Sequence, residues 1–178
     1  TFVPTDAGIA PPAIVEESPP EWAPIDVAVR AAIEAGKMPG CVVVVGRRDD
    51  ILFERAYGWR SLLPARAPMT KETLFDLASL TKPIATATAL MILVDRGNVD
   101  LDARASKYVP ELAKMPPFTV RQLLLHTSGL PSGTPLSEWT TDRAEVLQRI
   151  AALTLKSLPG EKFNYSDVGF GVLQEIIE

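Results

Sequence analysis

Two strand-like stretches separated by a polar turn constrain the fold most strongly. Cys41–Gly46 is a continuous, mostly β-branched run typical of a buried strand. Arg48-Asp49-Asp50 is a polar turn, and Ile51–Trp59 follows as a second strand, so the pattern predicts a β-hairpin. An isolated hairpin is only marginally stable in water, and the sequence offers no convincing further strands. We therefore expect that more sheet follows in a parent protein.

Helical periodicity dominates the rest of the chain. Residues 1–24 hold six of the sixteen prolines and predict an extended arm or linker, which leaves one domain at 25–178. Apolar spacing and capping residues predict helices over Ile25–Gly36, from about Ser79 to Arg96 with an end at Gly97, over Thr119–Leu125 with Thr119 as N-cap, over Asp142–Leu153, and from Val168 onward.

Composition excludes several classes of protein. Apolar residues make up 47% and charged residues 22%, which is ordinary for a globular chain, and a net charge of −4 gives no sign of nucleic-acid or anionic-membrane binding. The longest apolar run, Ile84–Val94, is too short to span a bilayer. One cysteine, Cys41, and one histidine, His126, exclude an internal disulfide and argue against a Cys/His zinc site. The first residue is Thr1 rather than Met, which indicates a processed or engineered product.

The segment Ser79-Leu80-Thr81-Lys82 carries the most chemistry, and it follows an apolar, strand-like stretch at Thr73–Leu77. A serine and a lysine three positions apart share one face of a helix, so a neutral lysine can take the serine proton before the hydroxyl attacks a carbonyl. Lowering a lysine pKa from about 10.4 to about 7 requires about 4–5 kcal/mol, toward which burial and the helix N-terminus both contribute. The alternative is that Ser79 only caps the helix and Lys82 is a surface lysine.

Longer motifs around this segment resemble a known family. Phe75–Lys82 resembles the nucleophile segment of serine β-lactamases and penicillin-binding proteins, in the class C-type branch that also contains D-alanyl-D-alanine peptidases and lactamase-like esterases. Thr119–Leu130 is very similar to that branch's T-x-R-x-L-L-x-H-T-S-G-L block. Shorter similarities lie at Pro39–Gly46, Ala56–Gly58 and Gly97–Asp102, so that the resemblance covers about residues 25–178.

The resemblance implies an α+β, β-lactamase-like fold, in which an antiparallel sheet is flanked by a terminal helix and accompanied by an all-helical region. On this view residues 25–178 are the N-terminal portion of such a domain, and the remaining strands follow residue 178. Ser79 would be the nucleophile and Lys82 its base, with the backbone N–H of Ser79 as an oxyanion donor.

A second family motif, Tyr-x-Asn, is present in altered form. The tyrosine of this motif assists proton transfer, and the asparagine binds the lysine and the substrate amide. Tyr165-Ser166-Asp167 matches it, with Tyr165 as proton shuttle and Asp167 in the substrate-binding position of the asparagine. A rival register takes Ser166-Asp167-Val168 as a degraded S-D-N motif of class A. Asp167 can also serve as a cap for the last helix.

The exchange of asparagine for Asp167 changes the electrostatics expected near Lys82. A carboxylate about 4 Å from an ammonium contributes about 4 kcal/mol at an effective dielectric constant of about 20, which favours the protonated lysine. Three arrangements remain open: Asp167 points away, Tyr165 carries more of the base role, or Asp167 is itself protonated. We expect the exchange to shift activity toward simple esters and away from β-lactams.

The single histidine permits another proposal, in which His126 is the base of a Ser-His-Asp triad. The chain has no G-x-S-x-G nucleophile elbow, so the usual partner is missing. In the resembled family the matching histidine is structural, and we favour that role for His126.

The family's third site element, a K-T-G or H-x-G on a strand that supplies a second oxyanion N–H, is not identified in this sequence. Loss of one oxyanion donor lowers rates by about 10²- to 10³-fold. We therefore expect the polypeptide to be weakly active or inactive alone, with a complementary C-terminal chain of the same precursor as one way to complete the sheet.

The predicted function is that of a serine hydrolase that forms an acyl-enzyme with a small-molecule substrate: a β-lactam, a D-Ala-type peptide or a small ester. The alternatives are a non-catalytic β-lactamase-like binding protein and an inactive fragment that needs a second chain. We expect no cofactor, no metal, no nucleic acid and no membrane span. Family resemblance favours the bacterial periplasm or secretion.

Overall fold

The computed structural model describes residues 19–133 and 142–178, and the chain divides into two compact units, Thr1–Asp76 and Leu77–Glu178. Each unit is described by itself. Residues 1–18 of the predicted arm lie outside the described residues, and the boundaries proposed at 1–24 and 25–178 stay a prediction. The expected α+β class is confirmed, since the described residues combine a three-stranded antiparallel sheet with several helices.

The first unit contains the predicted hairpin. Strand β1 (Gly40–Arg47) pairs antiparallel with β2 (Asp50–Ser61), with Cys41 opposite Tyr57 and Val45 opposite Phe53. The turn uses a positive φ of 55° at Arg48. A short strand β3 (Ala67–Pro68), which the sequence did not predict, pairs with the end of β2 and gives the sheet order β1-β2-β3.

Two sequence expectations about strands were wrong. Thr73–Leu77 is irregular rather than strand-like, and the side chain of Leu74 is 96% exposed. Strand β1 is only half-buried, with Val44 53% exposed. In both cases the missing factor is a neighbour, because strand hydrogen bonds and burial come from adjacent elements rather than from β-branched composition. Within the described residues, β1 pairs only with β2, and 73–77 pairs with no strand.

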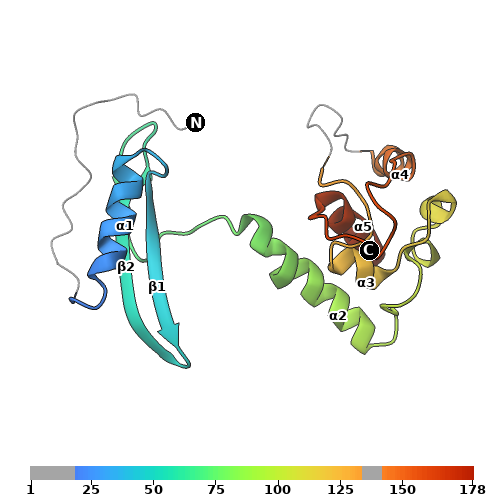
Figure 1. Ribbon diagram of the computed structural model, residues 1–178, viewed down its shortest axis with the longest axis horizontal. Helices are drawn as coiled ribbons and strands as arrows, with labels where there is room; N and C mark the ends of the chain where they lie inside the picture. The colour runs from blue at the N-terminus through green and yellow to red at the C-terminus, as the bar shows by residue number, and fades with distance from the viewer. Residues whose placement is uncertain (1–18, 134–141) are drawn as a thin grey trace. The chain divides into compact units, whose positions relative to one another are not determined.

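Helix α1 (Ala23–Glu34) packs against β2 through an unpredicted polar cluster (Figure 1). Asp26 is buried and accepts a 2.6 Å hydrogen bond from the Tyr57 hydroxyl. Arg55, on the same face of β2, donates from Nη1 to both carboxylate oxygens of Asp26 at 3.2 and 3.3 Å. The helix therefore attaches to the sheet through a buried carboxylate as well as through its apolar face. Burial and the Asp26 carboxylate together raise the pKa of Tyr57.

The second unit is helical. Its described residues contain three 3₁₀-helices, one π-helix and four α-helices. In chain order these are η1 (Ala78–Leu80), η2 (Lys82–Ala87), α2 (Thr88–Asp95), η3 (Ala105–Lys107), η4 (Pro110–Lys114), α3 (Val120–Leu124), α4 (Arg143–Ala151) and α5 (Asp167–Ile177).

The core of this unit gathers around α5, which packs against α2 and α3 (Figure 1). Val172 and Leu173 of α5 are fully buried, together with Leu90 of α2 and Val120 of α3. Burial of an aliphatic side chain of this size contributes about 1.5–3 kcal/mol. The first turn of α5 is thereby held firmly, and this turn carries Asp167.

The predicted helix from Ser79 to Arg96 is continuous in path but not in type. It begins as 3₁₀ (η1), widens to a π-turn over η2 and becomes α-helical only in α2, ending as predicted at Gly97, where φ is 74°. Pro83 has no N–H to donate to the preceding turn. On its other side, its carbonyl accepts a hydrogen bond from the Thr88 hydroxyl at 3.1 Å. The regular hydrogen-bond register is therefore relaxed beside Lys82.

One helical stretch, Ala78–Asp95, is long and apolar enough to cross a membrane by length and composition alone, with a mean hydropathy of 1.2 over 18 residues. A single stretch of this kind is weak evidence, because core helices pass the same test. Here it buries Leu90 in the core of the second unit and places Lys82 in an ion pair. We interpret it as a helix of the folded unit.

The buried carboxylate gives a first prediction. Asp26→Ala leaves the Tyr57 hydroxyl and the Arg55 guanidinium without their partner, and we expect it to destabilise the first unit by about 3 kcal/mol. The measurement is the urea dependence of Cys41 thiol labelling, since Cys41 lies opposite Tyr57 and is the sole thiol. Glu34→Ala, at an exposed position on the same helix, is the matched control. Equal labelling midpoints for the two variants would contradict the prediction.

Candidate active site

The two residues of the S-x-x-K segment lie at the junction of η1 and η2. Ser79 is the middle residue of η1, Lys82 begins η2, and Lys82 Nζ lies 3.5 Å from Ser79 Oγ. Ala78, directly before the serine, has a φ of 43°, a left-handed conformation that costs a residue with a Cβ about 1–3 kcal/mol. Such strain persists only where the surroundings enforce it, and here it lies at the residue directly before Ser79.

Lys82 lies in an environment that favours its charged form. Its Nζ is 2.6 Å from Asp167 Oδ1, and it lies 5.0 and 5.6 Å from the ring centroids of Tyr165 and Phe170, within the range of cation–π attraction. The side chain is only 16% exposed. Hydrogen bonds to Asp167 first and to Tyr165 second raise the pKa of Lys82, although burial acts in the opposite direction. Asp167 therefore points toward the lysine rather than away from it.

Tyr165 completes the group. Its phenol hydrogen-bonds with Lys82 and, more weakly, with Ser79, and both interactions lower the pKa of Tyr165. Its side chain is exposed on one side. The structure thus brings Ser79, Lys82, Tyr165 and Asp167 together from two segments more than eighty positions apart in the sequence.

Asp167 is held by the way in which α5 begins. Ser166 is the N-cap: its Oγ accepts from the Gly169 N–H at 2.9 Å and donates to the Pro131 carbonyl at 2.6 Å. The Asp167 N–H donates to the Ser132 carbonyl at 2.8 Å. Because the cap belongs to Ser166, the carboxylate of Asp167 is left available for Lys82.

The ring of His126 lies against the ring of Tyr165 and bonds to the residue that follows it. Its Nδ1 accepts a hydrogen bond from the Ser166 N–H at 3.0 Å, and its ring lies 4.5 Å from the Tyr165 ring and 5.0 Å from the Phe170 ring, centroid to centroid. The residue adopts a φ of 57°. Burial and the charge on Lys82 lower the pKa of His126, so the ring is neutral near pH 7. These contacts give His126 the structural role favoured from the sequence rather than that of a triad base.

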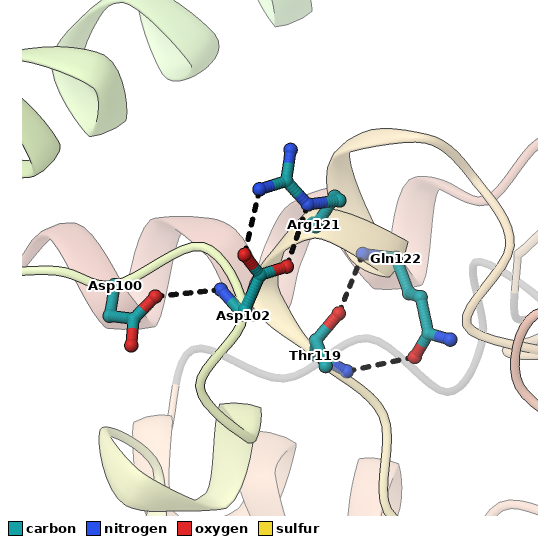
Figure 2. A network of polar contacts seen from close by, with 5 residues as sticks. All are labelled: Asp100, Asp102, Thr119, Arg121 and Gln122. Carbon is teal, nitrogen blue, oxygen red and sulfur yellow. Dashed lines mark hydrogen bonds and ion pairs between the residues drawn. The ribbon is translucent and has the colours of Figure 1, made fainter.

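The helix before His126 is anchored by a polar network (Figure 2). Thr119 and Gln122 form a reciprocal capping box at the start of α3, as the N-cap prediction requires. Arg121 donates from Nε and Nη2 to the two oxygens of Asp102 at 2.7 and 2.9 Å, and the Asp102 N–H donates to Asp100 Oδ1. The hydrogen bond from Arg121 lowers the pKa of Asp102. The loop after α2 is thus tied to the first turn of α3, the helix that precedes His126.

Gly129 allows the following loop to close. It has a φ of 83°, and a Cβ here would collide with the Ser157 carbonyl oxygen. The Lys156 N–H donates to the Gly129 carbonyl at 2.8 Å in the same close approach. The glycine of the H-T-S-G-L stretch therefore has a steric reason, and the loop that carries Pro131 and Ser132 depends on it.

Sequence reasoning missed Phe170, whose ring packs on His126 and faces Lys82. A signal was present, because residue 170 lies three positions after Asp167 and so shares a face of the same helix. It also missed Asn164, whose Nδ2 donates to the Leu130 carbonyl at 2.6 Å and clips the Tyr165 loop in place. No cluster of three or more metal-binding side chains occurs within residues 19–133 and 142–178.

With this geometry established, comparison with known proteins gives the class. A model of the beta-lactamase family matches residues 25–178, and the chain belongs to this family. A crystal structure of a class C beta lactamase superposes with a TM-score of 0.74 at 28% identity, over 86% of this chain and 42% of its own. The class C-type resemblance inferred from the motifs is confirmed.

Curated relatives include esterase EstB of Burkholderia gladioli, 32% identical over 98% of this chain and 49% of its own length. Another is an N-acetylmuramyl-L-alanine amidase of Bacillus subtilis (strain 168), 30% identical over all of this chain and 46% of its own length. The chain therefore spans about half the length of the curated relatives it matches. These matches give no support to the expected complementary chain.

The supporting histidine gives a second prediction, with a defined sign. The folded state holds the His126 pKa below the ordinary value of about 6.5, so protonation favours the unfolded chain. Relative to His126→Asn, which keeps an acceptor and tolerates positive φ, the unmodified protein should lose stability as pH falls through about 6.5 toward the lowered pKa. Urea midpoints at a series of pH values measure this. A difference between the two proteins that stays constant with pH would contradict it.

Proposed function

We propose that the protein is a serine hydrolase that forms an acyl ester on Ser79. The observation that carries the proposal is the direct contact of Ser79 with Lys82 and Tyr165, two proton-carrying side chains from different segments. A serine hydroxyl is a weak nucleophile until a neighbouring base removes its proton, and this arrangement supplies candidates at hydrogen-bond range.

In the proposed reaction, Ser79 Oγ attacks the substrate carbonyl while its proton passes to the Lys82–Tyr165 pair. The pair then protonates the leaving group. In the second half of the reaction, a water molecule gives a proton to the pair and attacks the acyl ester, and the pair returns the proton to Ser79 Oγ. The backbone N–H of Ser79 is the proposed donor to the developing oxyanion. A second donor would come from an element outside these residues, as the resembled family implies.

The environment of Lys82 affects which member of the pair takes the first proton. The pKa of Lys82 is raised and that of Tyr165 is lowered, and these shifts favour an ammonium beside an acidified phenol. Our expectation from the sequence is that Lys82 is the base. That role requires a neutral Lys82 amine beside a protonated Tyr165 phenol. Since the two groups share hydrogen bonds, we assign the proton-accepting function to the pair.

The substrate classes we propose are β-lactams, D-Ala-type peptides and small esters, with Asp167 in contact with the bound substrate. Relatives described as an esterase and an amidase support acyl transfer at an ester or amide carbonyl. The exposed side chains of Ser79 and Tyr165 support approach of the substrate from solvent.

Covalent labelling tests the proposal directly. The natural polypeptide that contains these residues should gain the mass of one fluorophosphonate adduct on Ser79, and Ser79→Ala should abolish it. Ser106→Ala, a serine on η3, is the matched control and should label normally. Persistent absence of an adduct on Ser79 would favour the non-catalytic binding protein instead.

The charge on Asp167 gives a prediction about pH. This carboxylate raises the pKa of Lys82 and also acts to raise that of Tyr165, so Asp167→Asn should lower both. The pair must lose one proton before it can accept the serine proton. The acid limb of kcat/KM for a neutral phenyl ester should therefore move to lower pH in the variant. An acid limb that stays in place, or moves to higher pH, would contradict this.

A further inference from the structure

The ammonium of Lys82, which lies beside the proposed nucleophile Ser79, is neutralised by its ion pair with Asp167. Lys82 Nζ lies 3.5 Å from Ser79 Oγ and 2.6 Å from Asp167 Oδ1, so the carboxylate lies within two hydrogen-bond lengths of the attacking oxygen. The other titratable groups that face the lysine are Tyr165, whose pKa Lys82 lowers, and His126, whose pKa is lowered by burial and by Lys82, so that the His126 ring is neutral near pH 7. Lys82 and Asp167 thus place one positive and one negative charge beside Ser79.

The two charges differ in their access to solvent. The Lys82 side chain is 16% exposed and lies against the rings of Tyr165 and Phe170, whereas the Asp167 side chain is 57% exposed. Ser79 is exposed as well. An acyl group that approaches Ser79 from solvent therefore meets the carboxylate more openly than the ammonium.

The backbone position of Asp167 is fixed, and its carboxylate is directed by its contact with Lys82. The N-cap hydroxyl of Ser166 and the Asp167 N–H bond to the carbonyls of Pro131 and Ser132, so the first turn of α5 is fastened to the neighbouring loop. Asp167 is not the N-cap itself, and its contact with Lys82 is with a residue of another element. A role in which Asp167 only begins a helix does not require that contact.

We infer that Asp167 is a specificity-determining residue, which selects uncharged acyl groups over acyl groups that carry a carboxylate. The inference rests on the proposed acylation of Ser79. The physical reason is that a substrate carboxylate near Ser79 meets the exposed negative charge of Asp167 and finds the nearby ammonium already compensated. Like charges at close range disfavour binding and also the transition state that follows it.

A pair of esters that differ only at the far end of the acyl group, a methyl ester in one and a carboxylate in the other, tests the inference. The probes are p-nitrophenyl methyl adipate, which is neutral, and p-nitrophenyl hydrogen adipate, which is anionic, with the rate of Ser79→Ala subtracted as background. The natural polypeptide should show a higher kcat/KM for the neutral ester. In Asp167→Asn the ratio of anionic to neutral kcat/KM should rise about tenfold at low salt. Glu111→Gln removes an exposed carboxylate on η4 and should leave the ratio unchanged.

The dependence on salt supplies a second measurement. The Debye length falls from about 30 Å at 0.01 M to about 3 Å at 1 M ionic strength, so discrimination by the unmodified protein should weaken as salt is added, while Asp167→Asn changes less. A ratio that is the same in both proteins and insensitive to salt would overturn the inference while leaving acylation of Ser79 standing. Absence of turnover of both esters together with absence of a Ser79 adduct would overturn the proposed function itself, and the inference with it.

Discussion

The contact between Lys82 and Asp167 is the interaction on which the geometry of the site depends. It joins the start of η2 to the first turn of α5, and the phenol of Tyr165 lies against the same ammonium. An ammonium that is 16% exposed requires compensation, because burial of an unpaired charge costs several kcal/mol. The carboxylate supplies it, and the rings of Tyr165 and Phe170 supply more. Removal of either charge would therefore disturb both segments at once.

Two loops hold this contact in place through hydrogen bonds, in addition to the apolar burial of α5. The stretch around Tyr165 is bonded to the loop after α3 through Asn164, Ser166 and Asp167. The ring of His126 also contacts the stretch around Tyr165: it accepts a hydrogen bond from the Ser166 N–H and lies against the Tyr165 ring. Side chains that carry chemistry are thus set by neighbours whose own positions are fixed by hydrogen bonds, which is the condition for a preorganised site.

The sequence predicted those parts of the molecule that local patterns determine. The hairpin, the Thr119 cap, the end of the long helix at Gly97 and the last helix all follow from turn chemistry, capping and periodicity, and each is confirmed. The class C-type family was recognised from long motifs, and the match over residues 25–178 confirms it. Expectations failed where non-local pairing decides the outcome. Thr73–Leu77 has strand composition but no partner within the described residues, and the Asp26 cluster joins residues about thirty positions apart. The contact of Lys82 with Asp167 excludes one of three arrangements that the sequence left open, in which Asp167 points away, since charge alone does not determine a rotamer.

The same ion pair that stabilises Lys82 as a cation works against Lys82 as a base, and the arrangement of the site reconciles the two effects. In the proposed mechanism, the proton that leaves Ser79 passes to a group that lies beside an ammonium and a carboxylate, whose charges offset each other. Tyr165 interacts with both Ser79 and Lys82, so in the proposed mechanism a phenolate at Tyr165 accepts the serine proton, and the neighbouring ammonium stabilises that phenolate before the transfer. Asp167 limits that stabilisation, because it also raises the pKa of Tyr165. We therefore expect the carboxylate at this position to weaken the stabilisation of the proton acceptor and to increase the discrimination against anionic acyl groups, and both proposed effects originate in one negative charge 2.6 Å from Lys82 Nζ.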